Sequence, residues 1–203
     1  MNKANDPRAH EAALAAADHM LGDADASLTL VEYGDYECPA CTQAEPLTRH
    51  LVKSFGKRLR FIYRHFPLME MHPQSELAAE AAEAAAAQGE FWAMHQLLCS
   101  HPHQLDLAAL ATHAQSIGLD MNRFKGEMAD RIYTQRIQEH RRAGERSGVH
   151  ATPSFFLNGT PVDVSFGFEK LEEAIHAAVD VTLPAASPAS PASYASHASV
   201  KHP

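Results

Sequence analysis

The chain has 203 residues, of which 45% are hydrophobic and 21% charged, so it can bury the core of one domain, or of one domain with an insertion. A formal net charge of −8 makes nucleic acids and anionic membrane surfaces unsuitable partners, and no apolar run approaches the ~18 residues that span a bilayer. With only three cysteines, the chain is not a disulfide-rich scaffold.

The N-terminal segment, residues 1–26, is expected to be an extension outside the core, with a short helix over Pro7–Ala17. Its alanine-rich part is flanked by Glu11 and Asp18 and lacks large apolar residues, unlike a secretory signal. We therefore expect a cytoplasmic protein. In that compartment a cysteine pair is more often catalytic, redox-sensing or metal-binding than structural.

A buried strand, a turn and a Cys-x-x-Cys pair follow one another after this extension. Ser27–Tyr33 is apolar on both faces apart from Thr29 and Glu32, which is typical of a central strand. Cys38 and Cys41 come next, and apolar residues then recur at helical spacing up to Gly56. A strand, a turn and Cys-x-x-Cys at the start of a helix form a redox signature.

The spacing of the pair has a chemical reason. A thiolate at Cys38 would face the unpaired N–H groups and the positive end of the helix dipole, which lower a cysteine pKa. Pro39 suits the first helical position because its missing N–H has no partner there. Cys41 lies one turn later on the same face, within reach of a disulfide. We therefore assign Cys38 as the attacking thiol and Cys41 as the resolving one.

The rest of the chain predicts an α/β fold with a helical insertion. Arg60–Arg64 is expected to be a second strand, parallel to the first because a helix connects them. Ser154–Leu157 and Thr160–Ser165 form a hairpin through Asn158-Gly159, and an amphipathic helix over Phe168–Val179 follows. Between the two halves the sequence predicts helices alone: Glu76–Gln88, Phe91–Leu98, Leu105–Ile117 and Met121–Ile137.

This order predicts a four-stranded mixed sheet flanked by helices, which is a thioredoxin-like fold. The thioredoxin-like domain comprises residues 27–68 and 148–181, and the inserted helical domain comprises residues 69–147. Residues 182–203, almost entirely Pro, Ala and Ser, are expected to be a disordered tail.

Several separate motifs resemble those of the DsbA-like thiol–disulfide oxidoreductases, a thioredoxin-fold family with an inserted helical domain. The resemblance covers about residues 18–181. The motifs that carry it are Asp18-His-Met-Leu-Gly22, Val31-Glu-Tyr-Gly-Asp-Tyr-Glu-Cys-Pro-Ala-Cys41, Tyr63-Arg-His-Phe-Pro-Leu68, Phe91-Trp-Ala-Met-His95 and Gly148-Val-His-Ala-Thr-Pro153.

The resemblance implies roles that spacing alone does not give. It implies that Pro153 is a cis-proline facing the cysteine pair and that the Thr152 backbone pairs with a substrate peptide, with Pro39 and Ala40 completing the substrate-binding residues. It also implies that Glu32 relays protons to Cys41. A carboxyl group in a central strand should have a raised pKa, which agrees with that role. The Pro-Ala dipeptide between the cysteines departs from the strong oxidants and isomerases, which carry a histidine there.

The expected function is thiol–disulfide exchange with protein or peptide substrates and an unidentified redox partner, through the catalytic residues Cys38, Cys41 and Glu32. The direction of exchange stays open. The alternative is a redox-sensor or partner-binding module without turnover. A glutathione-dependent isomerase of small molecules is disfavoured, because relatives of that kind carry serine in place of Cys38.

No metal or organic cofactor is expected. A structural zinc would need a second pair of ligands at similar spacing, which Cys99 and the scattered histidines do not provide. Cys99 is expected to be a small buried apolar residue. An apolar lip for unfolded peptides beside the cysteines is one interpretation of Phe66, Pro67, Leu68, Met69 and Met71, but ordinary core packing is the favoured one.

Overall fold

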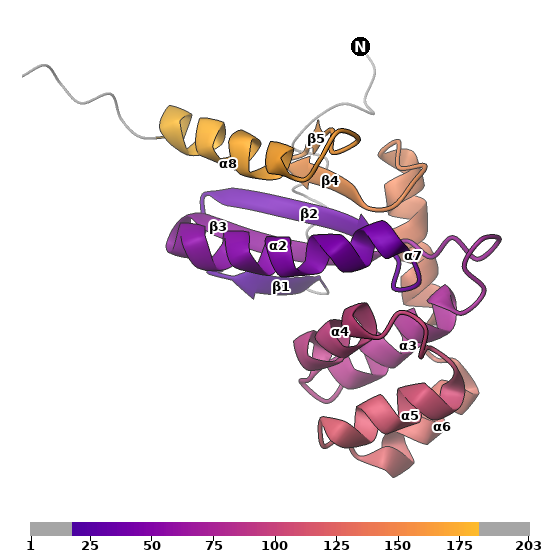
Figure 1. The fold of residues 1–203 in the computed structure, drawn as a ribbon. Coiled ribbons are helices and arrows are strands. Elements are labelled where there is room, and N and C mark those ends of the chain that lie inside the picture. Colours follow the sequence, from indigo (N-terminus) through magenta and orange to yellow (C-terminus); the bar gives the residue numbers. More distant parts are fainter. Residues whose placement is uncertain (1–17, 183–203) are drawn as a thin grey trace, which may run out of the picture.

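The computed structural model describes residues 18–182 of the chain (Figure 1). The helix expected over Pro7–Ala17, and all but the first residue of the tail expected over residues 182–203, lie outside this range. The described residues form a mixed sheet of order β1-β3-β2-β4-β5, with helices packed against it and an all-helical block to one side (Figure 1).

The centre of the sheet is formed by two parallel strands, β2 (Leu28–Gly34) and β3 (Leu59–His65). Strand β4 (Ser154–Leu157) pairs antiparallel with β2, and β5 (Thr160–Val162) pairs antiparallel with β4. Asn158 and Gly159 have φ values of 48° and 78°, which is the conformation that a two-residue hairpin turn requires. The predicted βαβ unit, the hairpin and the thioredoxin-like fold are therefore confirmed.

The predicted number of strands was wrong, because β1 (His19–Gly22) adds a fifth strand antiparallel to β3. This strand lies in the segment that we expected to be an extension. It is short, and its side chains alternate between half-buried and exposed positions, so it lacks the apolar run of a central strand. Gly22 has a φ of 103°, and a Cβ atom there would lie 2.7 Å from the carbonyl oxygen of Leu59.

Residues from β2 and β3 alternate between the two faces of the sheet. On one face, side chains of β2 and β3 pack with α2 (Pro39–Phe55), α8 (Glu169–Thr182) and the helical block. On the other face a smaller cluster forms from Val31, Tyr33, Ile62, Phe66, Val149 and Phe156. Strand β2 is buried along its whole length, as expected of a central strand.

The helical block contains α3 (Ser75–Ala86), α4 (Phe91–Ser100), α5 (Leu107–Ser116), α6 (Met121–Asp130) and α7 (Thr134–Arg146). The last two were predicted as one helix over Met121–Ile137, which was wrong. Arg131 ends α6 in the left-handed conformation, with a φ of 51°. Its guanidinium donates hydrogen bonds to Glu76 and Glu80 of α3, so a tertiary ion pair fixes the break.

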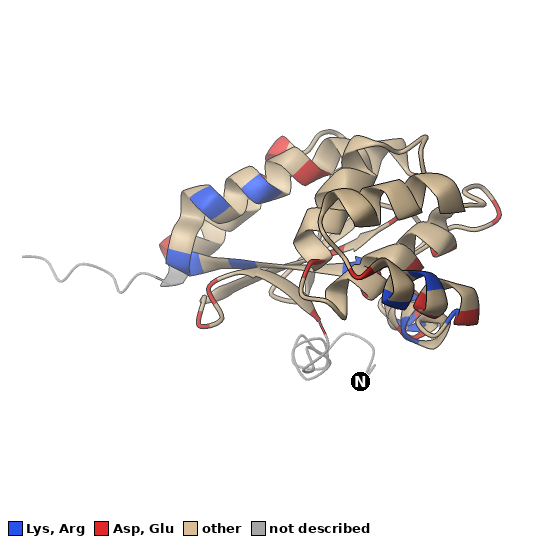
Figure 2. Cartoon of the chain, turned by 90° about the horizontal axis from the view of Figure 1, so that it is seen from below, with Lys and Arg blue, Asp and Glu red and all other residues tan. Residues whose placement is uncertain are grey.

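Acidic and basic residues are mixed along several helices of the described chain, while other helices carry few of them (Figure 2). Asp106 and Asp120 each cap the start of a helix by accepting two backbone N–H hydrogen bonds. Within residues 18–182, no helix combines the length and the apolar character that crossing a membrane requires.

Candidate active site around the Cys38–Cys41 pair

The cysteine pair lies where β2 ends and α2 begins. Cys38 is the N-cap residue of α2, and Pro39 occupies the first turn as predicted. Both cysteines are free thiols, with Cys38 7% and Cys41 3% exposed. The central strand, the turn and the N-terminus of the helix thus hold two sulfur atoms at one edge of the sheet.

The environment of Cys38 favours its thiolate. A hydrogen bond from the Cys41 thiol, assisted by the backbone N–H groups of Ala40 and Cys41, lowers the pKa of Cys38 to about 5, although partial burial acts against this. In its thiol form, Cys38 Sγ donates a hydrogen bond of 3.3 Å to the carbonyl oxygen of Thr152. The balance of these effects favours the thiolate, which is the reactive form of sulfur, at Cys38.

Cys41 has the opposite environment. Burial, the hydrogen bond to Cys38 and the nearby carboxyl group of Glu32 raise the pKa of Cys41 well above its ordinary value. The backbone N–H of Asp35 donates to Cys41 Sγ at 3.4 Å and favours the thiolate. The two thiols thus differ in acidity, and the difference matches the assignment of Cys38 as the attacking sulfur.

Glu32 is fully enclosed in β2. Burial, followed by the negative charges of Cys38 and Glu45, raises its pKa to about 8, as its position in a central strand led us to expect. A carboxyl group with this pKa exchanges its proton near neutrality. Its role as a proton relay stays a prediction.

The residues expected to bind substrate lie on both sides of Cys38. Pro39 is exposed and Ala40 half-exposed at the start of α2, while Thr152 and Pro153 are half-buried and immediately precede β4. The Thr152–Pro153 peptide bond is cis, as the resemblance implied. The structure therefore brings the two predicted groups together across the Cys38–Thr152 contact.

Asp35 is a residue of this site that the sequence reasoning missed. Its buried carboxylate accepts hydrogen bonds from the backbone N–H groups of Glu37 and Leu68 and from the His72 ring, each at 2.8 Å. These bonds join the loop before Cys38 to the loop after β3. The only sequence signal was an acidic residue in the turn after a buried strand.

The loop after β3 has a buried and an exposed part. Phe66 and Pro67 are buried, which agrees with core packing, whereas Met69 is 39% and Met71 68% exposed. Because Asp35 holds Leu68 and also contacts Cys41, the two methionines lie on a segment anchored to the cysteine loop.

Cys99 is buried, as expected, and burial raises its pKa well above the ordinary value. Its sulfur lies 3.8 Å from Nε2 of His95, whose Nδ1 lies 3.0 Å from the Tyr36 hydroxyl.

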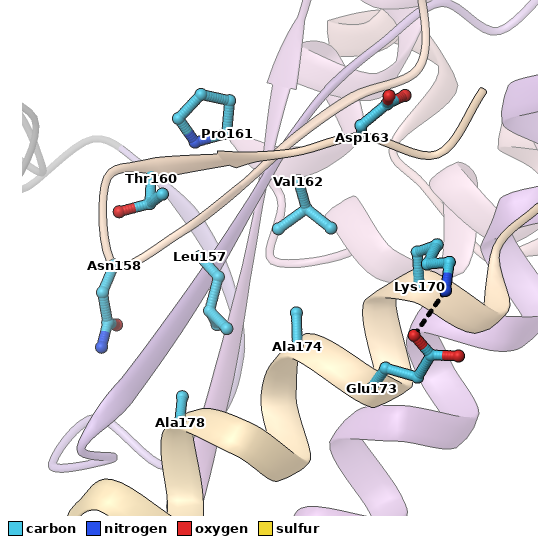
Figure 3. A pocket seen from close by; sticks show the side chains of 10 residues that line it. All are labelled: Leu157, Asn158, Thr160, Pro161, Val162, Asp163, Lys170, Glu173, Ala174 and Ala178. Carbon is cyan, nitrogen blue, oxygen red and sulfur yellow. Dashed lines mark hydrogen bonds and ion pairs between the residues drawn. The ribbon is translucent and has the colours of Figure 1, made fainter. Parts of the chain in front are cut away.

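A separate hollow of about 650 Å³ lies between the β4–β5 hairpin and α8, where Leu157, Val162, Ala174 and Ala178 form its apolar wall (Figure 3). None of the cysteines lines this hollow.

Comparison with known proteins agrees with this fold. The sequence model of the thioredoxin family matches residues 15–177. A thioredoxin-like oxidoreductase from Silicibacter pomeroyi superimposes with a TM-score of 0.73 at 26% identity, covering 89% of this chain and 99% of the other. The catalytic domain of ScsC from Proteus mirabilis gives a TM-score of 0.71 at 23% identity over 86% of this chain and 97% of its own.

Proteins named as antiporters are similar to this chain over only part of their length. The Na(+)/H(+) antiporter NhaA 1 of Salinispora arenicola is 45% identical over 161 residues, which are 79% of this chain and 24% of that protein. The Na(+)/H(+) antiporter NhaA of Herminiimonas arsenicoxydans is 36% identical over 161 residues, 79% of this chain and 25% of its own length. The chain thus spans about a quarter of the length of these relatives.

From the family match and the arrangement of sheet, cysteine pair and helical block, we conclude that the chain belongs to the thioredoxin family and has the fold of its DsbA-like thiol–disulfide oxidoreductases.

Proposed function

We propose that the protein is a thiol–disulfide oxidoreductase that exchanges disulfides with protein or peptide substrates through Cys38 and Cys41. The observation that carries this proposal is the difference in acidity between the two thiols: the pKa of Cys38 is lowered to about 5, whereas that of the neighbouring Cys41 is raised. A structural pair would not need one ionised and one protonated sulfur at the end of a strand.

The proposed reaction has two exchange steps. The Cys38 thiolate attacks one sulfur of a substrate disulfide, and the other substrate sulfur leaves as a thiolate that takes up a proton. Cys41 then loses its proton to the ionised form of Glu32 and attacks Cys38 Sγ, which releases the second substrate thiol and leaves a Cys38–Cys41 disulfide. Two electrons have then passed from the cysteine pair to the substrate. The reverse sequence oxidises a dithiol.

Substrate would lie against the exposed dipeptide Pro39-Ala40 and the backbone of Thr152. An extended peptide that pairs with Thr152 would place its own sulfur beside Cys38, because Cys38 Sγ already lies 3.3 Å from the Thr152 carbonyl oxygen. The exposed side chains of Met69 and Met71, on the segment that Asp35 anchors to the cysteine loop, offer adaptable apolar contacts for a peptide.

Turnover with insulin as substrate and dithiothreitol as reductant tests the proposal. The reduced enzyme should reduce many insulin molecules, and the Cys38→Ser variant should reduce none. A wild-type protein that reacts once and then stops would contradict the proposal.

The direction of exchange in the cell belongs to the same proposal. In the cytoplasmic location that we expect, the glutathione pool keeps such pairs reduced, so we propose a reductant. A reduction potential near that of thioredoxin, about −270 mV, would support this direction, whereas a value near about −120 mV would indicate an oxidant. Equilibration in glutathione buffers measures it.

A second candidate is a redox-sensing module without turnover. It is favoured by the similarity of this chain to proteins named Na(+)/H(+) antiporters. The matched segment is about a quarter of the length of those proteins, so it is one part of a larger protein there. The insulin assay separates the candidates, because a sensor would complete one exchange and would not turn over.

A further inference from the structure

Three ligand-type side chains meet between the sheet and the helical block. They are His19 of β1, His65 at the end of β3 and Glu83 of α3. Their ligand atoms lie within 4.8 Å of one another. Nε2 of His19 lies 2.8 Å from Oε1 of Glu83, and Nε2 of His65 lies 2.9 Å from the same oxygen.

The three ligand-type side chains differ in how far they are exposed to solvent. The side chains of Glu83 and His65 are 0% and 1% exposed, and that of His19 is 10% exposed. A cavity of about 310 Å³ is bordered by His19, Glu83 and Arg136. A water molecule takes up about 30 Å³ of liquid volume, so the cavity offers an entry path and room for a water ligand.

The donor set also suits a particular class of cation. Zn²⁺ can be bound by two imidazoles and one carboxylate, with its fourth coordination position open to water. Tetrahedral Zn²⁺ with bonds of about 2.1 Å separates its ligand atoms by roughly 3.4 Å. The two nitrogens are now 2.8 and 2.9 Å from the carboxylate oxygen, so a move of about half an ångström would admit the ion.

The histidine rings are oriented but can change tautomer. The Phe91 ring stacks on His19 with the centroids 3.5 Å apart, and the His140 ring stacks on His65 at 5.6 Å. Nδ1 of His65 has no hydrogen-bond partner in the described part of the chain. With the ring proton on Nδ1, Nε2 of His65 can bind a metal ion in place of its contact with Glu83.

Arg136 is a cationic side chain next to this cluster. Its Nε lies 3.2 Å from Oε2 of Glu83, and its Nη2 lies 3.4 Å from Nε2 of His19. The guanidinium places a positive charge beside the three ligands, and its side chain is 31% exposed along the cavity. A metal ion in the cluster would supply the positive charge that Arg136 now provides.

We propose that His19, His65 and Glu83 form a binding site for a divalent transition-metal ion of the Zn²⁺ class, with water from the cavity as fourth ligand and Arg136 as the displaced cation. The sequence shows no motif for this site, because its ligands are 18 to 64 positions apart and only the fold brings them together. A bound ion would join β1, β3 and α3 and so fix the helical block to the sheet.

Zinc binding is best measured in a background in which Cys38 and Cys41 are both serine, because that pair can itself bind zinc through its thiolates. Calorimetry with Zn²⁺ should show one equivalent bound. Co²⁺ in the same background should give visible d–d bands without a thiolate charge-transfer band. Zn²⁺ should also raise the melting temperature.

Four further substitutions in this background locate the site. Glu83→Gln and His19→Asn should each weaken Zn²⁺ binding by about 100-fold or more, since each removes a ligand. His140→Asn is the matched control, because it changes a neighbour of His65 that is not a ligand, and it should leave the affinity unchanged. Arg136→Gln should tighten binding on the order of tenfold by removing a nearby positive charge.

His19 is the least buried of the three ligands, with 10% of its side chain exposed, so its variant is informative even if Glu83→Gln does not fold. Absence of Zn²⁺ binding in the folded background protein would overturn the proposal. So would equal binding by the His19 variant, or a thiolate band with Co²⁺. The cluster would then be a hydrogen-bond network only.

Discussion

The carboxylate of Asp35 joins the cysteine loop to the loop after β3 through the ring of His72, with 2.8 Å between Oδ2 and Nδ1. The same residue donates its backbone N–H to Cys41 Sγ. The buried carboxylate of Asp35 therefore fixes the position of the Asp35 backbone N–H, which donates to the resolving sulfur. It also fixes the segment that carries the exposed methionines.

Asp35→Ala should lower the free energy of unfolding by about 3 kcal/mol and slow the resolution of a mixed disulfide. It leaves two backbone N–H groups and the His72 ring without their acceptor, and each buried unsatisfied group costs about 1–3 kcal/mol. Urea unfolding and the decay of a trapped mixed disulfide measure the two effects.

Glu37→Ala is the matched control for Asp35. It removes an exposed hydrogen bond of similar kind, to the backbone N–H of Gln74, and should cost less than about 1 kcal/mol. Equal losses in the two variants would show that Asp35 does not position the loops.

Iodoacetamide should label Cys38 with a pH midpoint near 5, while Cys41 and Cys99 in the native protein stay unreactive at neutral pH. The hydrogen bond from Cys41 is the largest cause of the low pKa of Cys38. Cys41→Ala should therefore lower labelling at pH 5–6 by roughly tenfold, whereas Cys41→Ser keeps a donor and should lower it less. Identical profiles for the two variants would assign the acidity to the helix terminus alone.

Glu32→Gln should slow the second exchange step and change the pH dependence of stability. The folded protein keeps the Glu32 proton up to about pH 8, whereas the unfolded chain releases it near 4.5. The stabilisation of the wild type from this group is complete below pH 4.5 and is lost as the pH rises through 8. Relative to wild type, Glu32→Gln should therefore gain a few kcal/mol between pH 4.5 and 8.

The control for Glu32 is Glu37→Gln, which alters a carboxyl group of the same segment outside the core. It should leave both the resolution rate and the pH dependence of unfolding near those of the wild type. A Glu32→Gln variant that matches this control would exclude the proton-relay role.

Gly144→Ala should destabilise the protein by about 1–3 kcal/mol. A Cβ atom at this position of α7 would lie 2.8 Å from the Phe66 ring and 3.0 Å from the Tyr33 ring, so it would overpack the smaller core cluster. Gly126→Ala in α6 meets nothing within 4 Å and should instead stabilise the helix by about 0.5–1 kcal/mol. Thermal or urea unfolding of the two variants provides the comparison, and a loss in both would contradict the packing argument.

Local patterns determined much of this protein. The apolar run before Gly34 defines the central strand, the Cys-x-x-Cys spacing with Pro39 marks the start of a helix, and Asn158-Gly159 defines a hairpin. Each of these features depends on backbone preferences or periodicity over a few residues, which the sequence contains directly. The raised pKa of Glu32 follows for the same reason, since a carboxyl group in a strand buried on both faces must lose water.

Tertiary structure decided the features that depend on partners far apart in the chain. Strand β1 is too short to form without β3, and the break at Arg131 depends on carboxylates of α3. The contacts of Asp35 with Leu68 and His72, and the convergence of His19 and His65 on Glu83, arise in the same way. Burial, charge and hydrogen bonding at these positions are set by neighbours that only the folded chain supplies, so no short-range pattern could predict them.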